Sequence, residues 1–237
     1  MKFTLKNPYS GLKAIPKNIW ILAAATLINR SGTMVLPFIA LYANQILNAS
    51  KSNAGLVLAT YGIGAFISSP FSGKLSDKIG AMRLMTISLI TTGLFLFIYS
   101  LVTDFTLFLA LTFIWAILSE AFRPASMAFI SDEISSDRRK TAFALQRLAI
   151  NLGMSIGPVI GGILSTINFH LLFYINGFTS LSAGIFLLFS HFEKHDSVQK
   201  ITEEILPAVS NQKVSVFSDR RLIYFLLALI PVEIVFF

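Results

Sequence analysis

The stretch LAINLGMSIGPVIGGILSTINFHLLFYINGFTSLSAGIFLLFSHF, residues 148–192, contains no Asp, Glu, Lys or Arg. A helix that crosses a bilayer needs about 20 mostly apolar residues, so this stretch is long enough for two crossings joined around residues 168–170. Three more runs without charge, residues 31–50, 52–73 and 84–103, each fit one crossing. Because these runs are continuous and do not alternate between apolar and polar residues, they indicate membrane-spanning helices and not the strands of a barrel.

The composition of the whole chain agrees with repeated membrane crossing. Of the 237 residues, 54% are hydrophobic and only 13% are charged, whereas soluble globular proteins average about 45–50% apolar and about 25% charged. That leaves too little polar surface for a soluble enzyme. The net charge of +7 would suit nucleic acid only on a solvated basic face, and the basic residues instead fall between the apolar runs. We therefore predict an all-α membrane protein with no nucleic-acid partner, a six-helix bundle over residues 18–192 with helices near 18–43, 53–72, 82–102, 105–131, 141–167 and 169–192.

The basic residues also predict the orientation of the bundle. Most of the 19 lysines and arginines lie before the first predicted helix or in every second connection after it, and the opposite connections contain only Lys51. The positive-inside rule therefore places residues 1–17 and a linker at 193–221 in the cytoplasm of a cell whose plasma or inner membrane holds the protein. Residues 222–237 form a seventh apolar run that is shorter than a crossing. We expect them to begin a truncated seventh helix, in a chain that is incomplete.

The connection between the second and third predicted helices carries the motif GKLSDKIGAMR, residues 73–83. It resembles the signature loop of the major facilitator superfamily, although Ala81 stands where the family usually has arginine. The resemblance implies the amino-terminal half of a twelve-helix fold, with a cytoplasmic loop that gates the contact between two six-helix halves. It also implies that Asp77 caps a helix of the partner half. The residues expected to act in this gate are Gly73, Asp77, Lys78, Gly80, Arg83 and Asp132.

The fifth predicted helix contains glycines at intervals of four residues. Gly153, Gly157 and Gly161 form one stripe of a helix, where the missing side chains allow another backbone to approach closely. Together with Pro158 and Gly162, the stripe looks like the helix-packing motif associated with antiporters of the same superfamily. That resemblance favours export over uptake.

The charged residues Arg30, Glu120, Arg123 and Arg147 lie inside the predicted spans. A charge at the bilayer centre costs at least ~2.5–3.5 kcal/mol. The first span, with Arg30, looks like that of the drug-efflux branch of the superfamily. The family architecture implies that Arg30 can meet Glu120 near the midplane, with Arg123 one turn away. Burial favours the neutral form of a carboxyl group and a neighbouring arginine favours its charged form, and a group under both influences suits proton coupling. The arginines could also bind an anionic group of the substrate. A purely structural ion pair is the alternative. Asn151 is expected to line the cavity or to bond across helices, and Arg147 to reach the cytoplasmic interface.

The sequence lacks the arrangements that other functions need. The three histidines have no metal-ligand spacing, no phosphate-binding glycine loop is present, and no nucleophile lies beside a base, so we predict neither an enzyme nor a cofactor. The predicted function is transport of a small organic solute, as proton-coupled export resembling multidrug efflux. Uptake of a metabolite and a non-transporting membrane subunit are the alternatives. The expected partners are substrate, protons, lipid, and the missing carboxy-terminal half or a second half-molecule, without which the chain should not transport.

Overall fold

The computed structural model describes residues 15–192. The predictions for residues 1–14, for the linker at 193–221 and for the seventh helix at 222–237 lie outside the described residues. The described part contains helices and no strands, and these helices make six segments long and apolar enough to cross a membrane. The six-helix prediction is therefore confirmed. The helices are α1 (Lys17–Ser31), α2 (Val35–Gln45), α3 (Lys51–Ile79), α4 (Ala81–Tyr99), α5 (Phe105–Glu120), α6 (Phe122–Glu133), α7 (Arg139–Ile167) and α8 (His170–Phe189).

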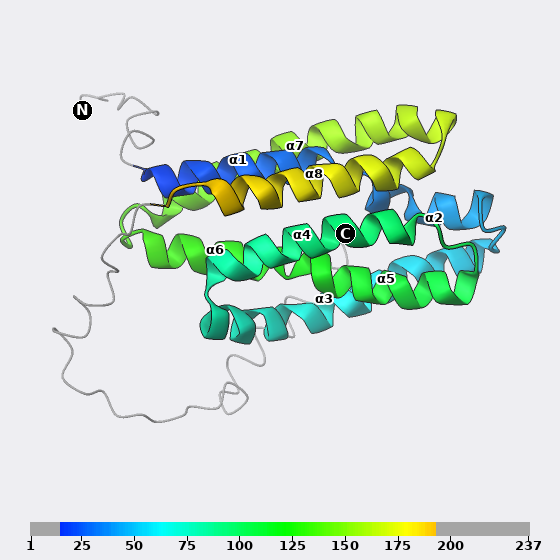
Figure 1. Cartoon of the computed structure of the whole chain (residues 1–237), viewed down its shortest axis with the longest axis horizontal. Helices are drawn as coiled ribbons and strands as arrows, with labels where there is room; N and C mark the ends of the chain where they lie inside the picture. The colour runs from blue at the N-terminus through cyan, green and yellow to red at the C-terminus, as the bar shows by residue number, and fades with distance from the viewer. Residues whose placement is uncertain (1–14, 193–237) are drawn as a thin grey trace, which may run out of the picture. The chain divides into compact units, whose positions relative to one another are not determined.

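The six spans pack in a symmetric pattern. The first span (α1 with α2) packs through α1 on the fifth (α7), the fourth span (α5 with α6) packs through α5 on the second (α3), and the third (α4) packs on the sixth (α8). Exchanging spans one to three with spans four to six leaves this set of contacts unchanged. Figure 1 shows α1, α7 and α8 side by side, with α3 to α6 as a second group below them. Internal repeats of this kind are common in transporters.

Two of the six spans are interrupted, which the sequence did not predict. The first span breaks at residues 32–34, between α1 and α2. The fourth is interrupted only at Ala121, between α5 and α6, where the backbone keeps helical angles of φ −62° and ψ −26°. The first break frees backbone N–H groups in the interior. Met34 N and Val35 N donate to the Asn176 side-chain oxygen of α8, at 3.3 Å each. A backbone donor without a partner costs several kcal/mol at membrane depth, so Asn176 makes this break tolerable.

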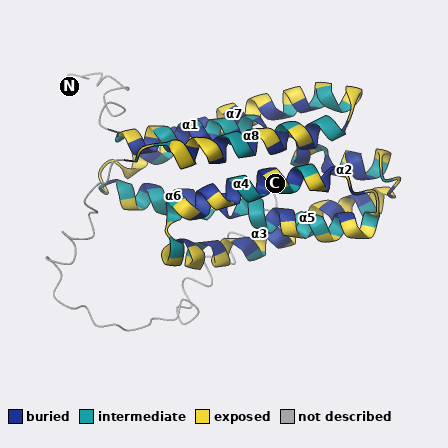
Figure 2. Ribbon diagram, in the orientation of Figure 1, coloured by how far each residue is buried: buried dark blue, intermediate teal, exposed yellow. Residues whose placement is uncertain are grey.

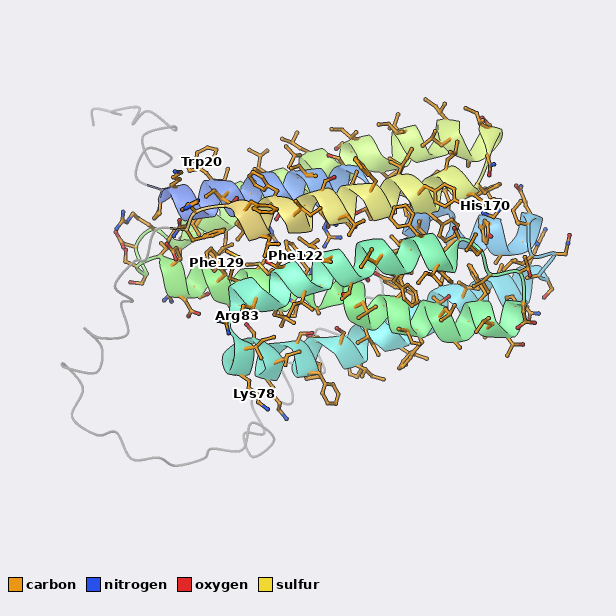
Figure 3. All side chains as sticks on the ribbon, viewed as in Figure 1. Trp20, Lys78, Arg83, Phe122, Phe129 and His170 are labelled. Atoms are coloured by element: carbon orange, nitrogen blue, oxygen red, sulfur yellow. The ribbon has the colours of Figure 1, made fainter. Side chains whose placement is uncertain are left out.

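The predicted loop at residues 73–83 is largely helical. Helix α3 continues through Asp77 and Lys78 to Ile79, and α4 begins at Ala81, so Gly80 alone joins the two helices. Gly80 has φ 91° and ψ 140°, a conformation that is strained for every other residue. Figure 3 labels Lys78 and Arg83 at this end of the bundle and His170 at the opposite end. The charged residues did not end the helix, because a helix that leaves a bilayer can continue into water.

The interior consists of two apolar clusters separated by a polar layer. One cluster surrounds Leu22, Leu89 and Phe122, and the other is rich in aromatic rings, with Tyr99 stacked on Phe108 at 4.6 Å between ring centroids. Figure 2 shows exposed positions along the helices, and many of the exposed residues have large apolar side chains, among them Phe66, Phe178 and Phe189. Apolar residues on both faces are expected where lipid surrounds a bundle, and close packing then drives helix association.

Helix α7 lies directly against the broken part of the first span. A Cβ atom added at Gly153 would lie 2.5 Å from Arg30 Cβ and 2.9 Å from Arg30 C, and one at Gly157 would lie 2.9 Å from Thr33 O. Gly161 continues the stripe against the Phe38 ring, where an added Cβ would lie 2.9 Å from Cε2. The glycine stripe therefore lets α7 reach the backbone where α1 ends.

Replacing Gly153 by alanine should destabilise the bundle. The new Cβ must push the backbone of α1 away, and overpacking of this kind costs typically about 1–3 kcal/mol. Gly62→Ala is the matched control, because nothing lies within 4 Å of a Cβ at Gly62 and alanine favours a helix over glycine by about 1 kcal/mol. Thermal unfolding in detergent should give a lower Tm for Gly153→Ala and an unchanged or higher Tm for Gly62→Ala. Equal Tm values for the two variants would contradict the close contact.

Candidate functional site

A small polar cavity lies at the level of the two helix breaks. It has a volume of about 40 Å³, enough for one or two water molecules. Arg30 lies two residues before the first break and Glu120 directly before the second, and both side chains line this cavity. The lining residues are Asn29, Arg30, Thr33, Leu36, Tyr61, Ser88, Leu89, Thr92, Trp115, Ser119, Glu120, Asn176 and Ser180.

Glu120 is held by a tyrosine from a neighbouring helix. The Tyr61 hydroxyl of α3 donates a hydrogen bond of 2.7 Å to Glu120 Oε1 and lies 3.3 Å from the Ser119 hydroxyl. The Tyr61 ring packs on Trp115 at 4.9 Å between centroids, which fixes the direction of its hydroxyl. The sequence analysis did not single out Tyr61, because an aromatic residue in an apolar helix carries no sign of its polar partner.

Arg30 faces the same cavity without a direct ion pair to Glu120 among residues 15–192. Its Nε atom is buried and donates to no partner in that part of the chain. The neighbouring Asn29 side chain donates to the Ser180 hydroxyl at 3.0 Å, which joins α1 to α8. Arg30 and Glu120 therefore line one polar cavity. The buried Arg30 Nε–H group has no acceptor among residues 15–192, and an unpaired buried donor of this kind destabilises the fold.

A second, larger cavity lies between α1, α6 and α7. Its volume is about 500 Å³, within the usual range for small-molecule sites. Four basic side chains line it and none of its lining residues is acidic; Arg30 belongs to both cavities. Phe122, which Figure 3 labels, is one of its apolar residues. The lining residues are Thr26, Arg30, Phe122, Arg123, Ser126, Met127, Lys140, Phe143, Ala144, Gln146, Arg147 and Ile150.

The other residues predicted to act at the site lie at different places. Arg123 and Arg147 line the larger cavity, whereas Asn151 is exposed on α7 and lines neither cavity. The gate residues Asp77 and Asp132 are exposed at the ends of α3 and α6. Within residues 15–192 their side chains make no hydrogen bond or ion pair, and the predicted partner half is outside that range.

The turn between α6 and α7 follows Asp132 and contains several charged residues that interact with one another or with the backbone. Arg139 donates to two carbonyls at the end of α6, Ile134 O at 3.2 Å and Ser131 O at 2.9 Å. Arg138 pairs with Asp137, and the hydrogen bond from Ser135 lowers the pKa of the exposed Asp137 carboxyl. These hydrogen bonds and this ion pair stabilise the turn between α6 and α7.

The described residues offer no metal site. No group of three or more His, Cys, Asp or Glu side chains in residues 15–192 could hold a metal ion. The chemistry available at the two cavities is therefore that of one carboxylate, one phenol and several cations.

Comparisons with known proteins identify the family. Residues 19–237 match the Major Facilitator Superfamily. The chain is 32% identical over 143 residues to the MFS-type transporter YqjV of Bacillus subtilis, an alignment that covers 60% of this chain and 35% of YqjV. It is 26% identical over 181 residues to the quinolone resistance protein NorA of Staphylococcus aureus, covering 75% of this chain and 46% of NorA. The chain thus spans less than half the length of these curated relatives.

The family match extends over most of the chain, and the fold agrees with it. Six membrane-spanning segments in two packed repeats are what half of such a transporter needs. The chain belongs to the Major Facilitator Superfamily, and it is an integral membrane protein of a family of transporters and not an enzyme.

Proposed function

We propose that the chain is one half of a proton-coupled exporter of small organic solutes, with Glu120 as the group that carries the proton. The observation that supports this most directly is the cavity at the two helix breaks, where Tyr61 holds the Glu120 carboxylate and Arg30 lies across from it. Discontinuous spans commonly form the substrate and ion sites of transporters. A charge kept at this depth at such a cost is typical of a functional site.

The direction of transport is inferred from two further features. The glycine stripe of α7, packed on the first break, looks like the antiporter motif of the family, and the similar NorA is a quinolone resistance protein. We also propose that the protein lies in the plasma or inner membrane with its amino terminus in the cytoplasm. The basic residues Lys78, Arg83 and Lys140 support this orientation, because basic residues favour the cytoplasmic side.

The proposed exporter works with a second helical half. The path of such transporters lies between two halves that rock about a central site, and this chain spans 46% of NorA. The gate residues fit that arrangement, since the exposed Asp77 carboxylate at the end of α3 can accept hydrogen bonds from the first turn of a helix in the other half. Gly80 then fixes the turn that holds Asp77 in place.

Glu120→Gln should abolish proton coupling. Glutamine keeps the size of the side chain and the acceptor for Tyr61, but it cannot bind and release a proton. Everted vesicles from cells that make the complete transporter, loaded with a pH-sensitive dye, report proton release when a quinolone such as norfloxacin is added. We expect the dye signal of Glu120→Gln to fall to that of empty vesicles. Asp137→Asn, which removes an exposed carboxylate from the α6–α7 turn, should retain the signal. Retained coupling in Glu120→Gln would reject this residue as the proton carrier.

Tyr61→Phe should weaken coupled transport without unfolding the protein. The change removes one oxygen and with it the 2.7 Å hydrogen bond to Glu120. Hydrogen bonds to charged groups contribute about 1.5–3 kcal/mol, so the rate of coupled transport should fall about tenfold or more. Tyr174→Phe is the matched control, because the Tyr174 ring packs on Phe97 and lines neither cavity. If both variants transport at the same rate, Tyr61 does not position the carboxylate.

A further inference from the structure

We propose that the larger cavity, between α1, α6 and α7, binds the anionic group of an amphipathic molecule, held by Arg123, Lys140 and Arg147 against an apolar wall. This inference rests on the proposed transport function and adds the chemical class of the solute. The shared chemistry is a carboxylate, sulfonate or phosphate joined to an apolar body. Such a group can belong to a soluble molecule or to the headgroup of an anionic lipid.

The first argument is the charge of the cavity. Arg30, Arg123, Lys140 and Arg147 all line it, and no Asp or Glu does. Like charges that share a cavity repel one another; Arg123, Lys140 and Arg147 are exposed and Arg30 is half-buried, so solvent weakens this repulsion without removing it. A bound anion removes the repulsion, whereas a cationic solute would increase it. The cavity therefore selects by charge.

The second argument is that these cations have no structural partners. In the described part of the chain, none of the four side chains donates a hydrogen bond or forms an ion pair, and Arg30 Nε is buried without an acceptor. The neighbouring arginines of the same turn differ, because Arg138 pairs with Asp137 and Arg139 donates to carbonyls of α6. Cations that held the fold together would be expected to show such contacts.

The third argument is the shape of the cavity and the nature of its wall. Lys140 lies in the first turn of α7 and Arg147 lies seven residues further on, which is about 10.5 Å along a helix. Phe122, Met127 and Phe143 lie among the cations. A cavity of about 500 Å³ with apolar walls and a few convergent charges fits an amphipathic anion better than a small inorganic ion.

Binding to the purified 237-residue chain in phosphatidylcholine nanodiscs tests this proposal without requiring transport. The probes are 4-phenylbutyrate, 4-phenylbutanamide and 4-phenylbutylammonium, which share one apolar body and carry negative, zero and positive charge. Calorimetric titration at neutral pH, corrected with empty nanodiscs, should give a Kd for the butyrate at least about tenfold lower than for the amide, and no binding of the ammonium. Equal affinities, or tighter binding of the ammonium, would overturn the proposal.

Variants then locate the binding. Arg147→Gln and Lys140→Gln should each weaken phenylbutyrate binding about tenfold. Lys74→Gln is the control, because it removes the same charge at the same end of the bundle from the exposed face of α3, outside the cavity. Circular dichroism checks that each variant folds. If Arg147→Gln unfolds, Lys140→Gln still tests the site, because Lys140 is exposed in the first turn of α7. Equal weakening by all three variants would overturn the site and indicate a general surface effect.

Competition distinguishes the two sources of the anion. Soluble short-chain phosphatidylglycerol should displace phenylbutyrate if lipid headgroups also enter the cavity, with short-chain phosphatidylcholine as the uncharged control. Lack of displacement limits the site to soluble anions, and either result supports an anion site. The two proposals can fail separately. If Glu120→Gln loses proton coupling but the chain binds no anion, only the proposed solute class is rejected. If the chain binds the anion but Glu120→Gln retains coupling, only the proposed proton carrier is rejected.

Discussion

Every backbone N–H and C=O group inside a bilayer must find its partner within the protein, and the rest of this structure depends on that constraint. Unbroken helices without an interior proline meet it without help, as α4 and α8 do, whereas Pro70 in α3 and Pro158 in α7 each remove one backbone donor. The first span does not, and the Asn176 side-chain oxygen accepts from both Met34 N and Val35 N where the span breaks. The break is stable because α8 carries an amide at the right depth and α7 carries glycines that allow close approach.

The same breaks concentrate polar groups in one layer between two apolar clusters. Arg30 precedes the break of the first span and Glu120 precedes the break of the fourth, and the two spans occupy corresponding positions in the packing. Tyr61 of α3 then fixes the Glu120 carboxylate. The first and fourth spans therefore bring Arg30 and Glu120 to one small cavity, and side chains of α3, α4 and α8 complete its wall.

The number of spans, their approximate positions and the family could be predicted from the sequence, because charge-free runs and the motif at residues 73–83 are local features. The interruption at Ala121 was missed although the sequence carries a signal for it: Pro124 has no N–H to donate to the Glu120 carbonyl, which disturbs the preceding turn. The predicted loop was too long because Asp77 and Lys78 look like loop residues, whereas Gly80 alone ends α3. Asn176 and Tyr61 were missed because their roles depend on residues 142 and 59 positions away.

Arg30 lines both cavities, and this position decides how a proton and an anion could affect each other. If a bound anion took the Arg30 guanidinium, the positive charge in the cavity that Glu120 lines would be neutralised, which favours a second positive charge there. Coupling of this sign between an anion and a proton is what symport needs and export by antiport does not. An exporter of anions must therefore hold the solute with Arg123, Lys140 and Arg147 while Arg30 remains in the cavity of Glu120, and must bind proton and solute in different conformations.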